Sequence, residues 1–230
     1  MSTIKKKELG IGAFLMATFI AVMIGIFLPL FDGGNALNYL DNLYNSISKG
    51  SAYYIPKVEH VIEEHGSEVV TLNLKMTDPG IAKSAEQLFS KAGATTAVEG
   101  DHLMVNGDLE AIFSVCLEDA ESAYHNRGED LVARYNMEAR SALHTWWLAL
   151  GAMEKDLNRQ KLFDAAQLTH TVQAKTVECA YNFYGIEAQA IKDRWGTVLF
   201  SLVFYVLYTV WYGYGIMYIF EGLGFELAAH

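Results

Sequence analysis

The sequence predicts a membrane-anchored α+β protein in which two transmembrane helices flank one exposed domain. Two apolar runs without a charged residue, 9–31 and 197–220, predict the two membrane spans. At ~1.5 Å per helical residue, each run is long enough to cross a hydrocarbon core of ~30 Å. The residues between them, 32–196, have the mixed composition of a soluble domain, which predicts a single folded body outside the bilayer.

The first apolar run follows a basic segment, Lys5 to Lys7, which is typical of a signal peptide or of an uncleaved anchor. Its length exceeds the ~7–15 apolar residues of a signal peptide, and no Ala-x-Ala cleavage site follows Leu30. The sequence therefore favours an anchor that stays attached to the domain.

Basic residues beside the spans predict the orientation. The lysines before the first span favour a cytoplasmic N-terminus, although Lys49, Lys192 and Arg194 give the loop side an equal number. Because the first helix usually sets the topology, we expect tails 1–8 and 221–230 in the cytoplasm. The main domain is then extracytoplasmic, or periplasmic, and the two spans lie in the inner (plasma) membrane.

The exposed domain is predicted to begin with amphipathic helices over 32–66. Asn35 is a suitable N-cap for the first of them, and Pro56 lies near the first turn of the second. Gly66 then ends the helical pattern.

A small β-α-β-β-α unit is predicted over 67–127. Residues 68–76 alternate apolar and polar side chains, which predicts a half-buried strand. Asp78, followed by proline, begins a helix, and Gly100 marks a hairpin turn between two short strands. Asp108 opens the second helix. We expect a three-stranded sheet with helices on one face.

Residues 128–196 are predicted to form a long antiparallel helical hairpin that continues into the second span. A glycine precedes a helical segment, 129–157, and the polar stretch 156–161 is the expected turn. The returning helix is expected to run from about residue 159 through Trp195 without a break.

Charge and cysteine content exclude several functions. The chain has 17 Lys and Arg against 27 Asp and Glu, and its net charge of −10 argues against nucleic-acid binding. Cys116 and Cys179 show no C-x-x-C spacing, which excludes standard c-type haem attachment and a zinc ribbon. The two thiols either pair in an oxidising compartment or serve as small buried side chains.

No pattern of catalysis is present. The sequence has no G-x-S-x-G elbow, no glycine-rich phosphate loop and no H-E-x-x-H motif, so we predict no catalytic site. His144 and His170 lie at equal distances in sequence from Leu157. A turn at Leu157 would place them level on facing helices, where they could hold a metal or a haem. Otherwise we expect no cofactor.

The second apolar run is unusually rich in aromatic residues. Tyrosine hydroxyls in lipid need hydrogen-bond partners, so we expect an intramembrane interface with other integral membrane subunits, or with a second copy of the chain. The residues proposed to share this face are Tyr205, Tyr208, Trp211, Tyr212 and Tyr218. The alternatives are a quinone or pigment contact, and plain aromatic packing against the first span.

The first apolar run contains mostly small residues at four-residue steps. Phe14, Ala17, Ala21 and Gly25 form this row, which would let another helix approach closely. The neighbour is either the second span or a helix of another protein.

In the exposed domain, Trp146 and Trp147 are adjacent on a predicted helix. One neighbouring element cannot bury both, so we expect one of them to meet another chain. The alternative is that the domain buries both.

Taken together, these features favour a non-catalytic accessory or scaffold subunit of a larger membrane complex. The first alternative is a subunit of an electron-transfer complex that carries a haem, metal or quinone. The second is a two-span sensor or chain-length regulator, although 195–220 lacks the proline-rich motif of polysaccharide chain-length regulators.

Overall fold

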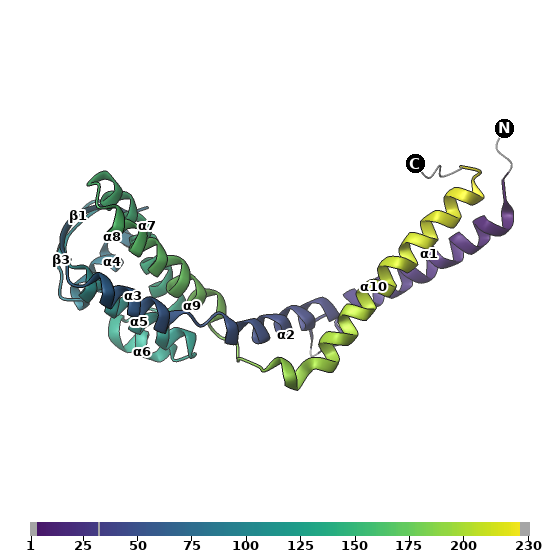
Figure 1. Cartoon of the computed structure of the whole chain (residues 1–230), viewed down its shortest axis with the longest axis horizontal. Coiled ribbons are helices and arrows are strands. Elements are labelled where there is room, and N and C mark those ends of the chain that lie inside the picture. The colour runs from purple at the N-terminus through teal and green to yellow at the C-terminus, as the bar shows by residue number, and fades with distance from the viewer. Residues whose placement is uncertain (1–3, 32, 226–230) are drawn as a thin grey trace. The chain divides into compact units, whose positions relative to one another are not determined.

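The computed structural model describes residues 4–31 and 33–225, and the chain divides into two compact units. Unit one comprises the described residues up to Ser48 and from Ala188 onward, whereas unit two comprises Lys49–Glu187. The described chain is mostly helical and contains one antiparallel sheet of three strands (Figure 1). This confirms the mixed α and β composition predicted from the sequence.

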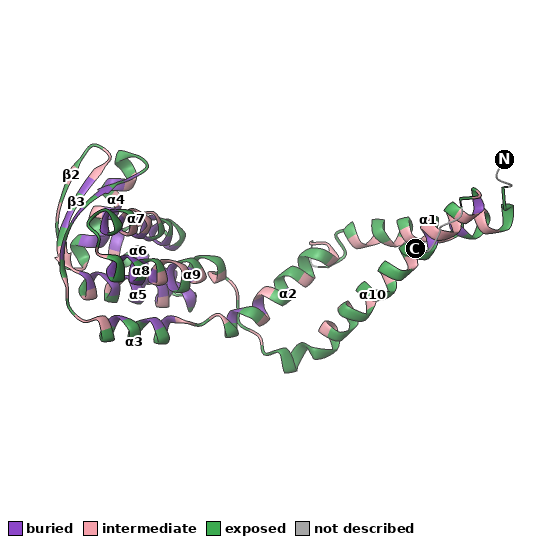
Figure 2. Cartoon of the chain, turned by 45° about the horizontal axis from the view of Figure 1, so that its top comes forward, coloured by how far each residue is buried: buried purple, intermediate pink, exposed green. Residues whose placement is uncertain are grey.

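Unit one contains two long apolar helices, α1 (Lys6–Phe27) and α10 (Ile191–Gly222), together with most of α2 (Ala36–Ser51). Both α1 and α10 are long and apolar enough to cross a membrane, and most of their surface is exposed (Figure 2). α1 stops at Phe27 because Leu28 takes the extended backbone that a following proline favours. Asn35 Oδ1 accepts from Asn38 N at 2.9 Å, which confirms the predicted cap of α2.

The sheet of unit two has the order β1-β3-β2, and its strands are β1 (Val69–Lys75), β2 (Thr95–Glu99) and β3 (His102–Asp108). Alternate residues of β1 are buried, as the sequence pattern predicts. In register, Leu72 lies opposite Val105, and both side chains are in the core. The other face of β1 is exposed, so helices cover one face only.

Three helices cover that face: α4 (Pro79–Lys91), α5 (Leu109–Tyr124) and α7 (Ala139–Arg159). Asp78 caps α4 by accepting from Gly80 N and Ile81 N, and Asp108 caps α5 by accepting from Ala111 N, as predicted. The remaining helix before the sheet is α3 (Ile55–His65), which ends at Gly66. The largest core side chains among the described residues are Trp146, Phe89 and Phe113.

Side chains from the C-terminal end of α7 bond the outer edge of β1. Asn73 N donates to Asp156 Oδ2 at 3.0 Å, and Arg159 Nη2 donates to Asn73 O at 3.3 Å. Gln160 Nε2 donates to Thr71 O at 2.9 Å. These bonds satisfy backbone groups that an edge strand otherwise presents to solvent.

The predicted helical hairpin exists but is shorter and more broken than expected. α7 turns at Lys161, whose φ is 64°, into α8 (Phe163–Val172), a π-helical turn η1 (Gln173–Val177) and α9 (Glu178–Phe183). The predicted segment 129–157 is not one helix, because α6 (Gly128–Tyr135) ends at Asn136 in the left-handed region. The helix therefore ends at an asparagine, a residue type that tolerates positive φ, and not at a glycine.

The prediction that the hairpin runs unbroken into the second span is wrong. α9 ends at Phe183, Gly185 has a φ of 84°, and α10 begins only at Ile191. Within unit two, Lys49 Nζ donates to Phe183 O at 3.2 Å and to Ile186 O at 2.6 Å. Asn126 Oδ1 accepts from Gly185 N at 2.7 Å. These contacts take up backbone groups that a continuing helix would need.

Candidate functional site

In unit one, α1 and α10 pack antiparallel through glycines. A Cβ on Gly12 would lie 2.7 Å from Ile219 N, and one on Gly222 would lie 2.5 Å from Leu9 N. A Cβ on Gly215 would lie 2.9 Å from Met16 Sδ. Only glycine permits such close approach of two helices. The heptad spacing of Gly215 and Gly222 in the sequence is the signal that could have predicted this contact.

A hydrogen bond and an ion pair join the two helices at one end of the pair. Lys5 N donates to Gly222 O at 2.9 Å, and Lys5 Nζ lies 3.2 Å from Glu221 Oε1. This pairing joins the start of α1 to the end of α10. It therefore fixes the register of the glycine contacts.

The aromatic residues of α10 do not form a single outward face. Tyr208 stacks on Phe19 of α1 with ring centroids 4.2 Å apart, and Tyr212 lies 5.1 Å from the same ring. At ~100° per residue, Tyr205 and Trp211 lie on opposite flanks of Tyr208. Packing against α1, the plain alternative, therefore accounts for Tyr208 and Tyr212.

One flank of the helix pair is hollowed. A shallow groove of about 450 Å³ is lined by Leu15, Leu207, Val210, Trp211, Tyr214 and Tyr218. The Nε1 atom of Trp211 is buried, and no acceptor among the described residues reaches it. A buried donor without an acceptor is unusual in proteins and costs ~1–3 kcal/mol. Two of the predicted interface residues, Trp211 and Tyr218, thus line this groove.

The small-residue row of α1 does not face α10. Phe14, Ala17 and Ala21 are exposed, whereas Gly12 is buried against Ile219. At ~100° per residue, the row lies on the opposite side of α1 from the glycine contact. Of the two neighbours considered for this row, the structure rules out α10.

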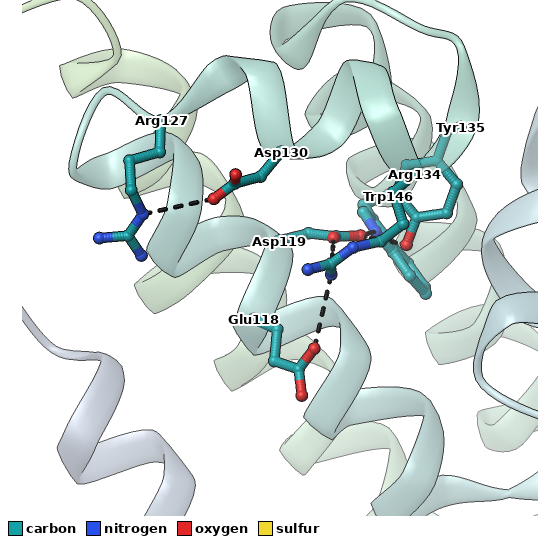
Figure 3. A network of polar contacts seen from close by, with 7 residues as sticks. All are labelled: Glu118, Asp119, Arg127, Asp130, Arg134, Tyr135 and Trp146. Carbon is teal, nitrogen blue, oxygen red and sulfur yellow. Dashed lines mark hydrogen bonds and ion pairs between the residues drawn. The ribbon is translucent and has the colours of Figure 1, made fainter.

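In unit two, Trp146 belongs to the core, so an interface role for it is wrong. Its Nε1 donates to Asp119 Oδ2 at 2.8 Å, and Tyr135 Oη donates to the same oxygen at 2.6 Å. Arg134 Nη1 donates to Asp119 Oδ1 at 2.6 Å (Figure 3). Burial raises the pKa of Asp119, while these hydrogen bonds and the charge of Arg134 oppose that shift. The buried carboxylate joins α5, α6 and α7.

Trp147 is the member of the pair that points outward. Its side chain is 41% exposed, and His144 stacks beside it with ring centroids 6.4 Å apart. Trp147 also lines a cavity of about 360 Å³ that is bounded by α7, α8, η1 and the end of β1. The alternative that the domain buries both tryptophans is therefore wrong, whereas a contact of Trp147 with another chain stays a prediction.

His144 and His170 do not lie level across the hairpin. His170 Nδ1 lies 3.3 Å from Glu154 Oε2, so the residue opposite His170 is Glu154. Ten residues separate Glu154 from His144, which is ~15 Å along a helix. The turn begins after Arg159 and not at Leu157, and this offset removes the predicted alignment. No cluster of three metal-ligating side chains occurs in the part of the chain that the structure describes.

A second cavity, which the sequence did not indicate, lies between α3 and α5. It measures about 350 Å³, and its rim includes Glu59, Glu63 and Glu110. Tyr53 Oη donates to Glu121 Oε1 at 2.7 Å, and burial together with this carboxylate raises the pKa of Tyr53 to about 12. The carboxylates around this cavity come from α3 and α5, two helices that lie side by side. No local sequence pattern indicates that these two helices are neighbours.

Both cysteines are free thiols. Burial raises the pKa of Cys116 well above its ordinary value, and burial also raises that of Cys179. Of the two alternatives, the structure favours unpaired small side chains over a disulfide: Cys116 is buried and Cys179 is half-buried.

No known protein family, curated protein or solved structure matches the chain. The functional argument therefore depends on the geometry of the groove in unit one and of the cavities in unit two.

Proposed function

We propose that the chain is a two-pass membrane protein that serves as a non-catalytic accessory or scaffold subunit of a larger membrane complex. Two apolar helices of sufficient length support the membrane location. The outward-facing Trp147 supports a second contact in the exposed domain. The orphaned indole N–H of Trp211 is the observation that carries the proposal.

In a hydrocarbon environment, the Trp211 N–H has no water to bond, so its acceptor must come from protein or ligand. The groove beside it is open along one flank of the helix pair and is lined by Tyr214 and Tyr218. A transmembrane helix of another subunit, with a Ser, Thr, Asn or Gln oxygen at this depth, would fill the groove. Because Nε1 is covered in the isolated chain, the indole must rotate toward the groove to donate to that oxygen. Trp211, Tyr214 and Tyr218 are then the binding residues.

The proposed partner contact is tested by crosslinking and substitution. A photoreactive residue at Val210, inside the groove, should crosslink to one membrane polypeptide of defined mass. Trp211→Phe should reduce that crosslink by roughly threefold to seventeenfold, because interhelical hydrogen bonds in membranes contribute ~0.6–1.7 kcal/mol. The crosslinked product, separated by mass, distinguishes a different subunit from a second copy of this chain.

Trp195→Phe is the matched control, because Trp195 is 65% exposed on the same helix and does not line the groove. It should leave the crosslink unchanged. Crosslinks to lipid alone, or equal losses in both variants, would refute the partner contact. A crosslink to a quinone would instead favour the electron-transfer alternative.

The proposed topology places the exposed domain outside the cytoplasm. A cysteine introduced by Lys91→Cys, at the exposed end of α4, should react with a membrane-impermeant maleimide added to intact cells. A cysteine at Lys7 should react only after the cells are opened. The reverse labelling pattern would place the domain in the cytoplasm.

A further inference from the structure

We propose that the cavity beside Trp147 binds a small organic acid that combines a flat aromatic ring with one carboxylate. The cavity of about 360 Å³ lies within unit two and is lined by Lys75, Trp147, Glu154, Lys155 and His170 among others. This volume is at the lower end of the range for ligand pockets, ~300–1,000 Å³, which is enough for a small molecule. The proposal does not depend on the groove of the helix pair, but it assigns the exposed face of Trp147 to a small molecule and not to a second protein contact.

The aromatic preference follows from the Trp147 indole. Its side chain is 41% exposed even though its helix neighbours Trp146 and Leu150 are fully buried. His144, which does not line the cavity, stacks beside it with an interplanar angle of 10°, so the indole already takes part in one aromatic contact. A flat ring placed against the indole would gain the ~0.5–1.5 kcal/mol typical of aromatic pairs beyond its area burial.

The preference for an anion follows from the local charge. Lys75 and Lys155 both line the cavity, and neither forms an ion pair with any carboxylate in residues 4–31 and 33–225. The one acidic side chain in the lining, Glu154, lies 3.3 Å from His170 Nδ1. This cavity thus carries unpaired positive charge in a chain whose net charge is −10. A carboxylate would supply the missing counter-charge.

The cavity wall is held in place by an irregular helix. Gln173 begins the π-helical turn η1, and its Nε2 donates to Trp147 O at 2.7 Å. A Cβ on Gly151 would lie 3.1 Å from Gln173 Nε2, so the glycine leaves room for this bond. Single π-helical turns occur frequently at functional sites. A glycine inside a helix costs ~1 kcal/mol of stability relative to alanine. In α7 this glycine, Gly151, lines the cavity.

The test uses three probes and the full-length protein in detergent. The probes are para-fluorophenylacetate, its neutral amide, and a fluorinated cyclohexylacetate that has the charge but no flat ring. Fluorine NMR line broadening measures binding of each. The aromatic acid should bind about tenfold more tightly than the amide, because the amide lacks the charge that both lysines recognise. It should also bind more tightly than the cyclohexyl acid.

Substitutions locate the binding. Changing both cavity lysines, Lys75→Gln and Lys155→Gln, should weaken the aromatic acid about fivefold or more, since each exposed ion pair contributes modestly. The matched control changes Lys83→Gln and Lys91→Gln, two exposed lysines of α4 that do not line the cavity. The control also subtracts partition of the probe into the micelle.

Trp147→Leu should weaken the aromatic acid while leaving the cyclohexyl acid nearly unchanged. Equal binding of acid and amide, or equal losses in the cavity and control variants, would overturn the proposal. Absence of any saturable binding would overturn it as well. If Trp147→Leu fails to fold, the comparison of the two double lysine variants still decides the outcome, because those substitutions alter exposed side chains only.

Discussion

Replacing Asp119 with alanine is expected to lower the free energy of unfolding of unit two by about 3–5 kcal/mol. Asp119 is fully buried and accepts hydrogen bonds from Arg134, Tyr135 and Trp146. Its removal leaves the Tyr135 hydroxyl and the Trp146 N–H without an acceptor, and it leaves the Arg134 cation with only its longer contact to Glu118 Oε2, at 3.5 Å. Leaving part of a buried polar network unsatisfied costs more than the network contributes when complete.

The measurement is urea denaturation of the full-length protein, followed by near-ultraviolet circular dichroism, which reports the packing of buried aromatic residues. Asp130→Ala is the matched control, because Arg127 Nε lies 3.4 Å from Asp130 Oδ2 and both side chains are about half exposed (Figure 3). An exposed pair of this kind contributes ~0–1 kcal/mol. Similar effects of the two substitutions would show that the Asp119 network does not stabilise the domain.

Leucine at Gly222 or at Gly12 is expected to separate α1 from α10. At either position a Cβ would meet backbone atoms, Leu9 N at 2.5 Å or Ile219 N at 2.7 Å, and backbone cannot rotate away as a flexible side chain can. Overpacking of this kind costs ~1–3 kcal/mol, which corresponds to about a fivefold to hundredfold loss of the paired state.

Disulfide formation between cysteines introduced by Lys5→Cys and Glu221→Cys measures the pairing, since the backbones meet here: Lys5 N donates to Gly222 O at 2.9 Å. Gly10→Leu and Gly213→Leu are the controls, because a Cβ at either position has no atom within 4 Å. They should leave the crosslinking rate unchanged. If all four variants crosslink equally fast, the glycine contacts do not hold the two helices together.

Local chemistry predicted the elements whose causes are local. The alternation in β1, the Asp78 cap and the turn at Gly100 are all present, because each depends on a few adjacent residues. The turn shows how local the cause is: Gly100 has a φ of 63°, and Glu99 pairs with His102 across it. Sequence reasoning at this range was sufficient for the sheet unit.

Features that depend on distant residues were not predicted. The chain breaks after Phe183 where Lys49, far away in sequence, takes up carbonyl groups that another helical turn would use. A helical wheel placed Tyr208 on a face but could not say that Phe19 of α1 covers it. The predicted alignment of His144 with His170 was wrong for a related reason. An error of a few residues in the position of a turn changes which residues lie opposite each other across the hairpin.

The bonded outer edge of β1 limits how the domain can polymerise. Fibres of paired strands grow only when each unit offers two free strand edges, one to accept the previous unit and one to template the next. In this sheet the outer edge of β1 is already bonded by side chains of Asp156, Arg159 and Gln160. The free strand edge that remains is the outer edge of β2. A second molecule that joined there would complete a closed pair, and propagation would stop after a single addition.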